Sequence, residues 1–372
     1  MTSPPTAQSA IRNPQSEISV VRESLNDWAK KAGRPLTLME VCGTHTMAIC
    51  RHGIPSLLPP SVRLVSGPGC PVCVTSQGQV DQIIELARRP DVTIATFGDM
   101  VRVPGTSSSL ERERARGADV RVVYSPHNAV ALAEALPSRQ VVFIGIGFET
   151  TQPTIAAALT EARKRNLRNF TVLPAGKTIP PALTALLDAS DLQLDGLICP
   201  GHVSVIIGSD AYKPFAQRYR LPCAVAGFEP LEILNALVAL VRQAAEGRAE
   251  VENVYGVWVR PEGNRRAQEM VETVFVPGPA RWRGLGVIEG SGLLLRDDWM
   301  DYDATQRFSI KEKDTPEPSG CQCGDVLRAR VRPFDCPLFG QVCTPENPVG
   351  PCMVSTEGSC AAAYRYGGAK SD

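Results

Sequence analysis

The sequence predicts an α/β fold, with two Rossmann-like parallel-sheet domains followed by a loop-rich C-terminal domain. From Leu36 to about Gly247, short β-rich apolar runs alternate with helical stretches, which is the pattern of βαβ units and parallel sheets. Past Gly247 this alternation fades, and from Asp314 onward little regular structure is expected. The length of 372 residues favours two or three domains of roughly 100 to 150 residues each.

The chain begins with a polar segment that contains prolines, so residues 1–16 are expected to be a loose tail rather than a signal peptide. A helix is expected over residues 17–35, where Gly33-Arg34-Pro35 ends it. Its apolar residues fall on one helical face, namely Ile18, Val21, Leu25 and Trp28. We expect this helix to pack on the C-terminal domain.

The alternating region divides near residues 137–140 into α/β domains over 36–138 and 139–247, which leaves 248–372 as the C-terminal domain. The expected strands are Leu36–Val41, Val62–Val65, Val92–Phe97, Val120–Tyr124, Val141–Ile146 and Phe170–Leu173. The expected helices are Val80–Arg89, Ala129–Leu136, Pro153–Arg165 and Glu229–Ala245. A weak repeat supports the division, because Gly147-Phe148-Glu149-Thr150 and Gly227-Phe228-Glu229-Pro230 each follow an apolar run and precede a helix. Chance recurrence of so short a motif is the alternative.

Composition excludes several classes of protein. Lysine plus arginine (39) balances aspartate plus glutamate (39), so no net charge directs the chain to nucleic acid or to a membrane surface. The apolar region Leu231–Val241 is interrupted by Glu232 and Asn235 and is shorter than the ~20 residues that span a bilayer. We therefore expect a cytoplasmic protein. In that reducing compartment, twelve cysteines indicate metal ligands or redox groups more than structural disulfides.

Cys42 lies in a turn that predicts a ligand site. A strand ends at Val41, Gly43 permits a sharp turn, and a helix begins shortly afterwards. Cys42 is therefore expected at the carboxyl end of a parallel strand, where ligand sites of α/β sheets lie. The helix amino terminus favours the thiolate, which binds metals and attacks electrophiles, and His45 is within reach as a proton carrier or orienting partner. A buried cysteine beside a capping threonine is the alternative.

A second turn holds Cys70 and Cys73 after the run Val62–Val65. Two glycines and two prolines fix an exposed backbone around this C-x-x-C pair, a spacing that dithiol redox sites and metal sites both use. Zinc is the weaker interpretation, because the chain has four histidines and no second C-x-x-C. If Cys42, Cys70 and Cys73 meet at the mouth of one sheet, their soft thiolates suit a metal such as iron.

Six more cysteines lie in the last 52 residues: Cys321, Cys323, Cys336, Cys343, Cys352 and Cys360. Four thiolates are what a [4Fe-4S] cluster requires, so two remain. A cluster beside a dithiol resembles ferredoxin-thioredoxin reductase, where electrons pass singly to a neighbouring disulfide. By that analogy Cys323 and Cys352 form the redox pair and the other four hold the cluster, although spacing alone leaves open which four are ligands. A zinc-stabilised or disulfide-linked tail is the alternative.

Several motifs in order together resemble the HypD family of [NiFe]-hydrogenase maturation proteins. The match runs from about Leu36 to Tyr366 and departs from the family pattern near Lys177 and His127. The motifs are Glu40-Val41-Cys42-Gly43-Thr44-His45-Thr46, Gly67-Pro68-Gly69-Cys70-Pro71-Val72-Cys73, Gly147-Phe148-Glu149-Thr150-Thr151, Pro200-Gly201-His202-Val203-Ser204, Trp282-Arg283-Gly284-Leu285-Gly286, Cys336-Pro337-Leu338-Phe339-Gly340 and Gly350-Pro351-Cys352-Met353-Val354.

The resemblance implies a scaffold that assembles the Fe(CN)2CO moiety of the hydrogenase active site. Iron would be held through Cys42 and the terminal cysteine of a small β-barrel partner, HypC, before transfer to the hydrogenase large subunit. HypE would deliver cyanide. Cys70 and Cys73 match the family's second essential motif, and Glu149 and His202 match further motif residues.

Two other functions are weaker. Nucleotide binding is disfavoured, because Gly145-Ile146-Gly147 lacks the third glycine of a dinucleotide fingerprint and no phosphate-loop motif occurs. A cluster-dependent disulfide reductase would use Cys70 and Cys73 as substrate-facing thiols. Infrared bands from metal-bound cyanide and carbonyl would separate the scaffold from the reductase.

Overall fold

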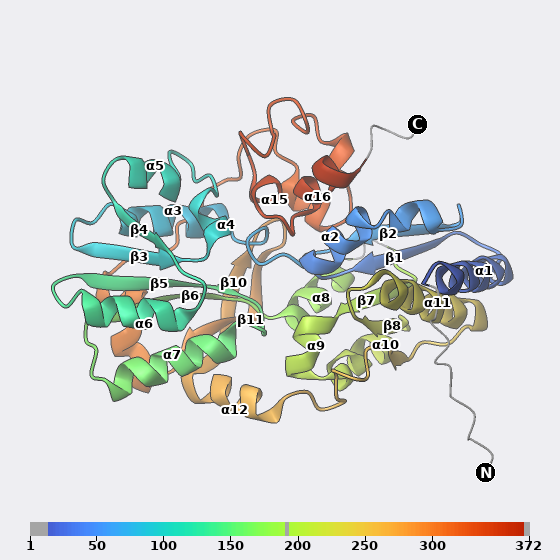
Figure 1. The fold of residues 1–372 in the computed structure, drawn as a ribbon, viewed down its shortest axis with the longest axis horizontal. Coiled ribbons are helices and arrows are strands. Elements are labelled where there is room, and N and C mark those ends of the chain that lie inside the picture. The colour runs from blue at the N-terminus through green and yellow to red at the C-terminus, as the bar shows by residue number, and fades with distance from the viewer. Residues whose placement is uncertain (1–13, 190–192, 368–372) are drawn as a thin grey trace, which may run out of the picture.

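The computed structural model describes residues 14–189 and 193–367, which form two parallel β-sheets side by side with helices around them (Figure 1). A long antiparallel hairpin and a cysteine-rich segment of short helices complete the fold. The predicted α/β class is therefore confirmed. Across the described part of the chain, every helix is too short or too polar to cross a lipid bilayer.

The first sheet has the strand order β2-β1-β7-β8-β9. Its strands are β1 (Leu36–Glu40), β2 (Val62–Ser66), β7 (Gly196–Pro200), β8 (Cys223–Ala226) and β9 (Val251–Asn253). Around it lie α1 (Pro14–Ala32), α2 (Gly43–Arg51), η1 (Ile54–Leu57), α9 (Gly201–Ile207), η2 (Ser209–Tyr212), α10 (Lys213–Tyr219) and α11 (Pro230–Glu246). Strands β7 and β8 are buried along their whole length, which explains their continuous apolar sequence.

The second sheet has the order β4-β3-β5-β6. Its strands are β3 (Val92–Thr96), β4 (Asp119–Val122), β5 (Gln140–Gly147) and β6 (Phe170–Gly176). Its helices are α3 (Gln77–Ala87), α4 (Gly98–Val101), α5 (Leu110–Ala115), α6 (Pro126–Ala135) and α7 (Gln152–Lys164). Helix α8 (Ile179–Asp188) then returns the chain to the first sheet. Every expected strand and helix is present, with ends within three residues of the prediction.

The two sheets are not the two consecutive units expected from the sequence. β1 pairs with β7, although all four strands of the second sheet lie between them in the chain. β3 pairs with β5, so the expected divide at residues 137–140 falls inside one sheet. Strands buried on both faces have similar apolar sequences, and the sequence pattern therefore does not determine which of them are neighbours.

The first helix also differs from its prediction. α1 begins at Pro14, inside the expected tail, and residues 1–13 lie outside the described residues. It packs along α11 rather than on the C-terminal domain, because Leu25 and Ala29 share an apolar cluster with Leu234 and Leu237. The expected position of this helix is therefore wrong, because α1 packs its apolar face on the apolar face of α11.

The region 248–372 is not a single C-terminal domain. β9 completes the first sheet, and α12 (Arg265–Val274) contacts both α7 and α9, so it joins the two halves of the molecule. The hairpin of β10 (Phe275–Trp282) and β11 (Gly286–Leu295) was not expected and packs on α8 and β6. The 3₁₀ turn η3 (Asp297–Tyr302) and α13 (Ala304–Arg307) follow the hairpin.

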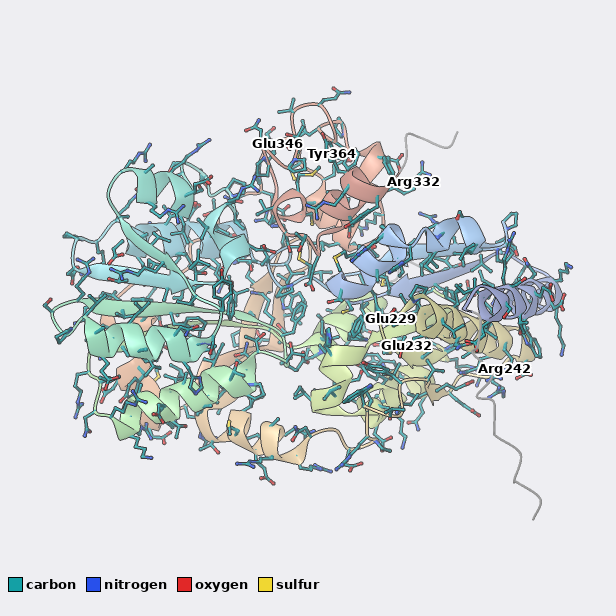
Figure 2. All side chains as sticks on the ribbon, viewed as in Figure 1. Glu229, Glu232, Arg242, Arg332, Glu346 and Tyr364 are labelled. Carbon is teal, nitrogen blue, oxygen red and sulfur yellow. A yellow bond between two sulfur atoms is a disulfide. The ribbon has the colours of Figure 1, made fainter. Side chains whose placement is uncertain are left out.

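The cysteine-rich segment begins near residue 320 and contains only short helices, as expected. They are α14 (Cys323–Leu327), η4 (Pro333–Asp335), α15 (Pro351–Val354) and α16 (Ser359–Tyr366). Arg332, Glu346 and Tyr364 mark its surface in Figure 2. The segment lies above the region where the two sheets meet (Figure 1).

Candidate functional site

Four motif turns follow four neighbouring strands of the first sheet. They contain Cys42 after β1, Cys70 after β2, His202 after β7 and Phe228 after β8. Because these strands are parallel and adjacent, their carboxyl ends meet at one edge, the usual place for a ligand site in an α/β sheet. This edge faces the middle of the molecule, opposite the carboxyl edge of the second sheet (Figure 1).

A buried carboxyl group holds the Cys42 turn. Cys42 is the N-cap residue of α2, and its amide donates a hydrogen bond to Glu40 Oε2 over 2.9 Å. The Thr46 hydroxyl donates to Glu40 Oε1 over 2.5 Å. Glu40 is 1% exposed, and burial raises its pKa to about 7. Sequence reasoning did not assign this role to Glu40, because a charged residue at a strand end gives no signal of burial.

Burial also decides the protonation of Cys42. It raises the pKa of the thiol to about 12, and the favourable backbone amides of His45 and Thr44 do not offset this cost. The helix amino terminus does favour the thiolate, as expected, but desolvation is the larger effect at the free site. A metal ion that binds here displaces the proton.

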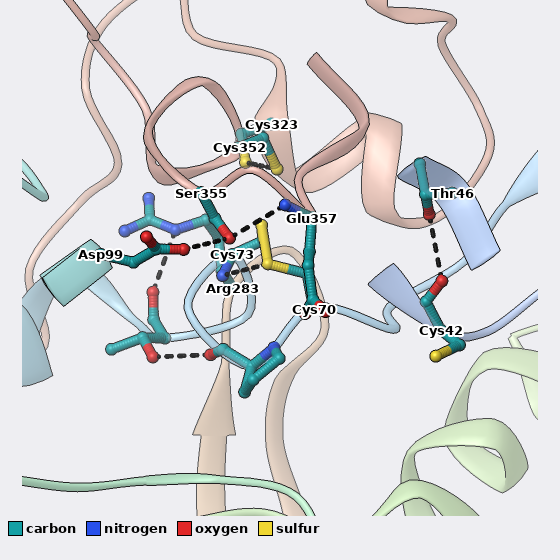
Figure 3. Close-up of a disulfide and its surroundings, with 12 residues drawn as sticks. Cys42, Thr46, Cys70, Cys73, Asp99, Arg283, Cys323, Cys352, Ser355 and Glu357 are labelled. Carbon is teal, nitrogen blue, oxygen red and sulfur yellow. Dashed lines mark hydrogen bonds between the residues drawn. A yellow bond between two sulfur atoms is a disulfide. The ribbon is translucent and has the colours of Figure 1, made fainter. Parts of the chain in front are cut away.

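The Cys70 and Cys73 turn touches the Cys42 turn through backbone. The Gly43 amide donates to Gly69 O over 2.8 Å, and a Cβ atom on Gly69 would lie 2.2 Å from the Cys42 nitrogen. Only glycine fits this contact. Cys70 and Cys73 are joined in a buried disulfide (Figure 3).

The three cysteines therefore do not form one set of thiolate ligands in this structure. Two of the three sulfur atoms are bonded to each other. Within residues 14–189 and 193–367, no group of three or more histidine, cysteine or acidic side chains converges so as to hold a metal ion. Cys42 remains as a single free thiol at the sheet edge.

Two histidines flank one aromatic ring at this edge. His45 Nε2 lies 2.7 Å from Gly227 O, so Nε2 carries the hydrogen, and Nδ1 has no partner among the described residues. Burial lowers the pKa of His45 to about 4, which keeps the ring neutral. The ring centroids of His45 and His202 lie 4.7 and 4.0 Å from that of Phe228. His45 thus presents a free acceptor nitrogen, and its role as proton carrier stays a prediction.

Glu149 belongs to the edge of the second sheet. Its Oε1 accepts a hydrogen bond from the Ile179 amide over 2.8 Å, and its Oε2 has no partner among the described residues. Burial raises the pKa of Glu149 to about 7. The structure therefore places Glu149 in the turn after β5, against the amino terminus of α8.

All six C-terminal cysteines line one cavity, together with apolar side chains that include Leu338 and Met353. The Sγ atoms of Cys323 and Cys352 lie 2.6 Å apart. The other four are Cys321, Cys336, Cys343 and Cys360. A [4Fe-4S] cluster takes one thiolate on each of four irons, so its ligands surround a space instead of converging on one ion. Four free thiols around an apolar cavity fit that requirement.

Cys323 and Cys352 are coupled through a hydrogen bond between their sulfur atoms. The hydrogen bond between them lowers the pKa of Cys323 and raises that of Cys352, and the charge of Arg283 also lowers the pKa of Cys323. A thiolate is the form that attacks a disulfide. The assignment of these two cysteines as a redox pair stays a prediction, and this geometry is compatible with it.

The cysteine-rich segment docks on both sheets. Thr44 Oγ1 donates to Glu357 Oε1 over 2.7 Å, and a Cβ atom on Gly43 would lie 2.5 Å from Glu357 Cβ. Ser355 Oγ donates to Asp99 Oδ2 over 2.8 Å (Figure 3). Sequence reasoning missed these contacts, because residues more than 250 positions apart give no local signal. The segment is therefore held directly over the two cysteine turns.

The fold and the site define an α/β protein with two parallel sheets, in which cysteines lie at one sheet edge and around one C-terminal cavity. Residues 17–367 match the sequence model of the HypD family, described as "Hydrogenase formation hypA family". The chain is 50% identical over 341 residues to the hydrogenase expression/formation protein HupD of Azotobacter chroococcum mcd 1, covering 90% of each chain. It is 49% identical over 341 residues to hydrogenase maturation factor HypD of Azotobacter vinelandii, again covering 90% of each chain.

A third relative has a similar level of identity. Over 350 residues the chain is 46% identical to hydrogenase maturation factor HypD of Escherichia coli strain K12, covering 94% of each chain. The chain therefore belongs to the HypD family of hydrogenase maturation factors. The resemblance read from its motifs is confirmed.

Proposed function

We propose that this chain is the scaffold on which the Fe(CN)2CO moiety of the [NiFe]-hydrogenase active site is assembled, with the iron held on Cys42. The observation that carries the proposal is the meeting of the Cys42 and Cys70 turns at one sheet edge, in backbone contact through Gly69. A soft thiolate is a suitable ligand for such iron. Family membership supports the proposal, because the curated relatives are named for hydrogenase formation or maturation.

The number of free donor side chains at the carboxyl edge of the first sheet determines how many ligands this chain can give to the iron. No three donors of the described residues converge, so Cys42 would supply one ligand and further ligands would come from outside the chain. Cyanide, carbon monoxide and the terminal cysteine of the small partner HypC would complete the coordination. HypE would deliver cyanide, and HypC would carry the finished moiety to the hydrogenase large subunit.

Cys321, Cys336, Cys343 and Cys360 would hold the [4Fe-4S] cluster, which supplies single electrons when bound. In the thiol chemistry that follows, a Cys323 thiolate attacks the Cys70–Cys73 bond and forms a mixed disulfide, and the leaving thiolate takes up a proton. Cys352 then resolves the mixed disulfide, so that Cys323–Cys352 is oxidised and the other pair is a dithiol. Two electrons and the one proton of the Cys352 thiol move to the Cys70–Cys73 pair, and solvent supplies the second proton of the new dithiol.

The second candidate function is a cluster-dependent disulfide reductase, because the Cys70–Cys73 disulfide is the expected resting form of such an enzyme. Both functions require the cluster. Only the scaffold binds iron that carries cyanide and carbonyl.

Infrared spectroscopy of the anaerobic complex with HypC tests the proposal. The wild type should show bands of metal-bound cyanide and carbonyl, and Cys42→Ala should abolish them while leaving the brown cluster absorbance unchanged. Cys50→Ala is the matched control, because Cys50 is a free cysteine at the far end of the same helix. Bands that persist in Cys42→Ala would refute the ligand role, and a wild type without bands would favour the reductase.

The cluster assignment has a separate test in Cys336. Replacing Cys336 with alanine should bleach the cluster and increase proteolysis of residues beyond 320, because ligation energy is also folding energy in a segment with so little regular structure. Removal of iron by a chelator should have the same effect on the wild type. Unchanged absorbance in the variant would contradict the assignment.

A further inference from the structure

The tip of the β10–β11 hairpin is bonded to the chain directly after Cys73. The Arg283 amide donates to Val74 O over 2.9 Å, and its Nε donates to Thr75 O over 3.0 Å. Its Nη2 donates to Gln77 Oε1 over 3.2 Å. The Arg283 side chain is fully buried. One side of the hairpin tip is thus fixed to the loop that carries Cys70 and Cys73.

The same tip is pressed against the residue after Cys323. A Cβ atom on Gly284 would lie 2.6 Å from the Gly324 Cα, so the two backbones are in direct contact. The Gly284 amide donates to Glu317 Oε1 over 3.0 Å, and Arg283 Nη1 lies 3.7 Å from Glu317 Oε2. One turn of the hairpin therefore touches the segments of both sulfur pairs.

Burial of the Arg283 guanidinium costs free energy, and an apolar side chain could fill the same space without that cost. Its Nη1 lies 3.7 Å from Glu317 Oε2 but makes no hydrogen bond with the described residues, and a buried donor without a hydrogen bond costs about 1–3 kcal/mol. A guanidinium presents its donors in a rigid planar fork, so it holds several acceptors in fixed directions, as a lysine ammonium on a flexible stem does not. The bonds to Thr75 and Gln77 use that fork.

We propose that Arg283 is a positioning residue for thiol–disulfide exchange, which holds the Cys70–Cys73 loop and the Cys323–Cys352 segment in the mutual orientation that exchange requires. The inference rests on the proposed electron route between the two pairs. Attack by a thiolate on a disulfide sulfur is directional, so a small displacement of either segment slows the step steeply. Figure 3 shows both pairs with Arg283 in one close-up.

The test uses the full chain with its cluster, prepared anaerobically and fully reduced. A pulse of oxidised dithiothreitol introduces one disulfide per chain; after acid quenching and alkylation, mass spectrometry follows its movement between the two pairs. Arg283→Met should slow this movement at least about tenfold without a change in cluster absorbance. Arg283→Lys should restore part of the rate, because it keeps the charge but not the fork.

Arg281→Met is the matched control. Arg281 lies on the same hairpin, and its guanidinium pairs with Glu312 and Asp314 instead of bonding to Thr75 or Gln77, so its variant should exchange at the wild-type rate. If Arg283→Met loses its cluster, Glu317→Gln replaces it, since glutamine keeps the bond to the Gly284 amide but removes the charge near Nη1; this variant should also slow exchange.

The outcomes separate the two proposals. Exchange at the wild-type rate in Arg283→Met, or in Glu317→Gln where that variant stands in, overturns the positioning role alone. Equal slowing in Arg281→Met also overturns it, because the effect would then belong to the hairpin as a whole. A wild type that shows no movement between the pairs overturns the proposed electron route, and the positioning role with it.

Discussion

The tripeptide Gly-Phe-Glu ends a strand in each parallel sheet, and its residues have different roles at the two edges. In the first sheet, Gly227 O accepts from His45 and the Phe228 ring stacks on His202. Glu229 is exposed and begins α11, where it forms a capping box with Glu232 (Figure 2). The first edge thus combines aromatic, imidazole and thiol groups beside a helix end.

In the second sheet the same motif is covered. Phe148 stacks on Trp282 of the β10–β11 hairpin with centroids 5.8 Å apart. Glu149 is 7% exposed and faces the amino terminus of α8. The hairpin therefore seals one edge, whereas the other keeps His202 accessible. The comparison teaches that the motif fixes a strand-to-helix turn, while the neighbouring segments decide whether the turn becomes a site.

The largest expected effect contrasts two glycines at the two edges. Gly69→Ala should lower the free energy of unfolding by about 3 kcal/mol and displace Cys42, because the new Cβ would lie 2.2 Å from backbone. Gly176→Ala is the matched control and should cost about 1 kcal/mol, since the atoms nearest to its Cβ belong to the Gln152 side chain and not to backbone. Urea unfolding of both variants measures the difference. Equal costs would show that the Cys42 turn can shift freely.

A smaller effect concerns how the free energy of unfolding depends on pH, and it compares Glu149 with Glu229. Burial raises the pKa of Glu149 from 4.5 to about 7, so the folded state holds the proton more tightly than the unfolded state. This stabilisation is fully present below pH 4.5 and is lost as the pH rises through 7, by an amount on the order of 2 kcal/mol. Glu149→Gln should abolish that loss in unfolding measured between pH 4 and 8.

Glutamine retains the Oε1 acceptor for the Ile179 amide, so the fold itself should survive this substitution. Glu229→Gln is the control at the exposed edge, and its weakened cap should cost about 0.5 kcal/mol. A wild type whose dependence on pH matches that of Glu149→Gln would mean that Glu149 is solvated in solution.

The smallest effect concerns the two phenylalanines. Phe228→Leu should cost about 0.5 kcal/mol, and it should raise the pKa of His202, because burial lowers that pKa in the wild type. Phe148→Leu should cost about 1 kcal/mol through the lost stack with Trp282 without moving the His202 signal. NMR titration of the His202 ring measures the shift. A response of His202 to Phe148→Leu instead would contradict the separation of the two edges.

The sequence by itself determined the secondary elements and the turns that carry the chemistry. Apolar runs followed by glycine-containing turns placed Cys42 and Cys70 at the carboxyl ends of parallel strands, and the structure has them there. The clustering of six late cysteines likewise predicted a shared site, and all six line one cavity. These features depend on residues close together in the chain, so periodicity and turn chemistry are sufficient to find them.

Only the tertiary structure decided which strands are neighbours, what covers each edge and which groups are buried. The interleaved sheets, the position of α1 along α11, the hairpin that brings Arg283 between two sulfur pairs, and the contact of Glu357 with Thr44 all join residues far apart in sequence. Burial likewise raised the pKa of Cys42, although the nearby helix amino terminus lowers it. Desolvation depends on every atom packed around a group, and one stretch of sequence does not contain that sum.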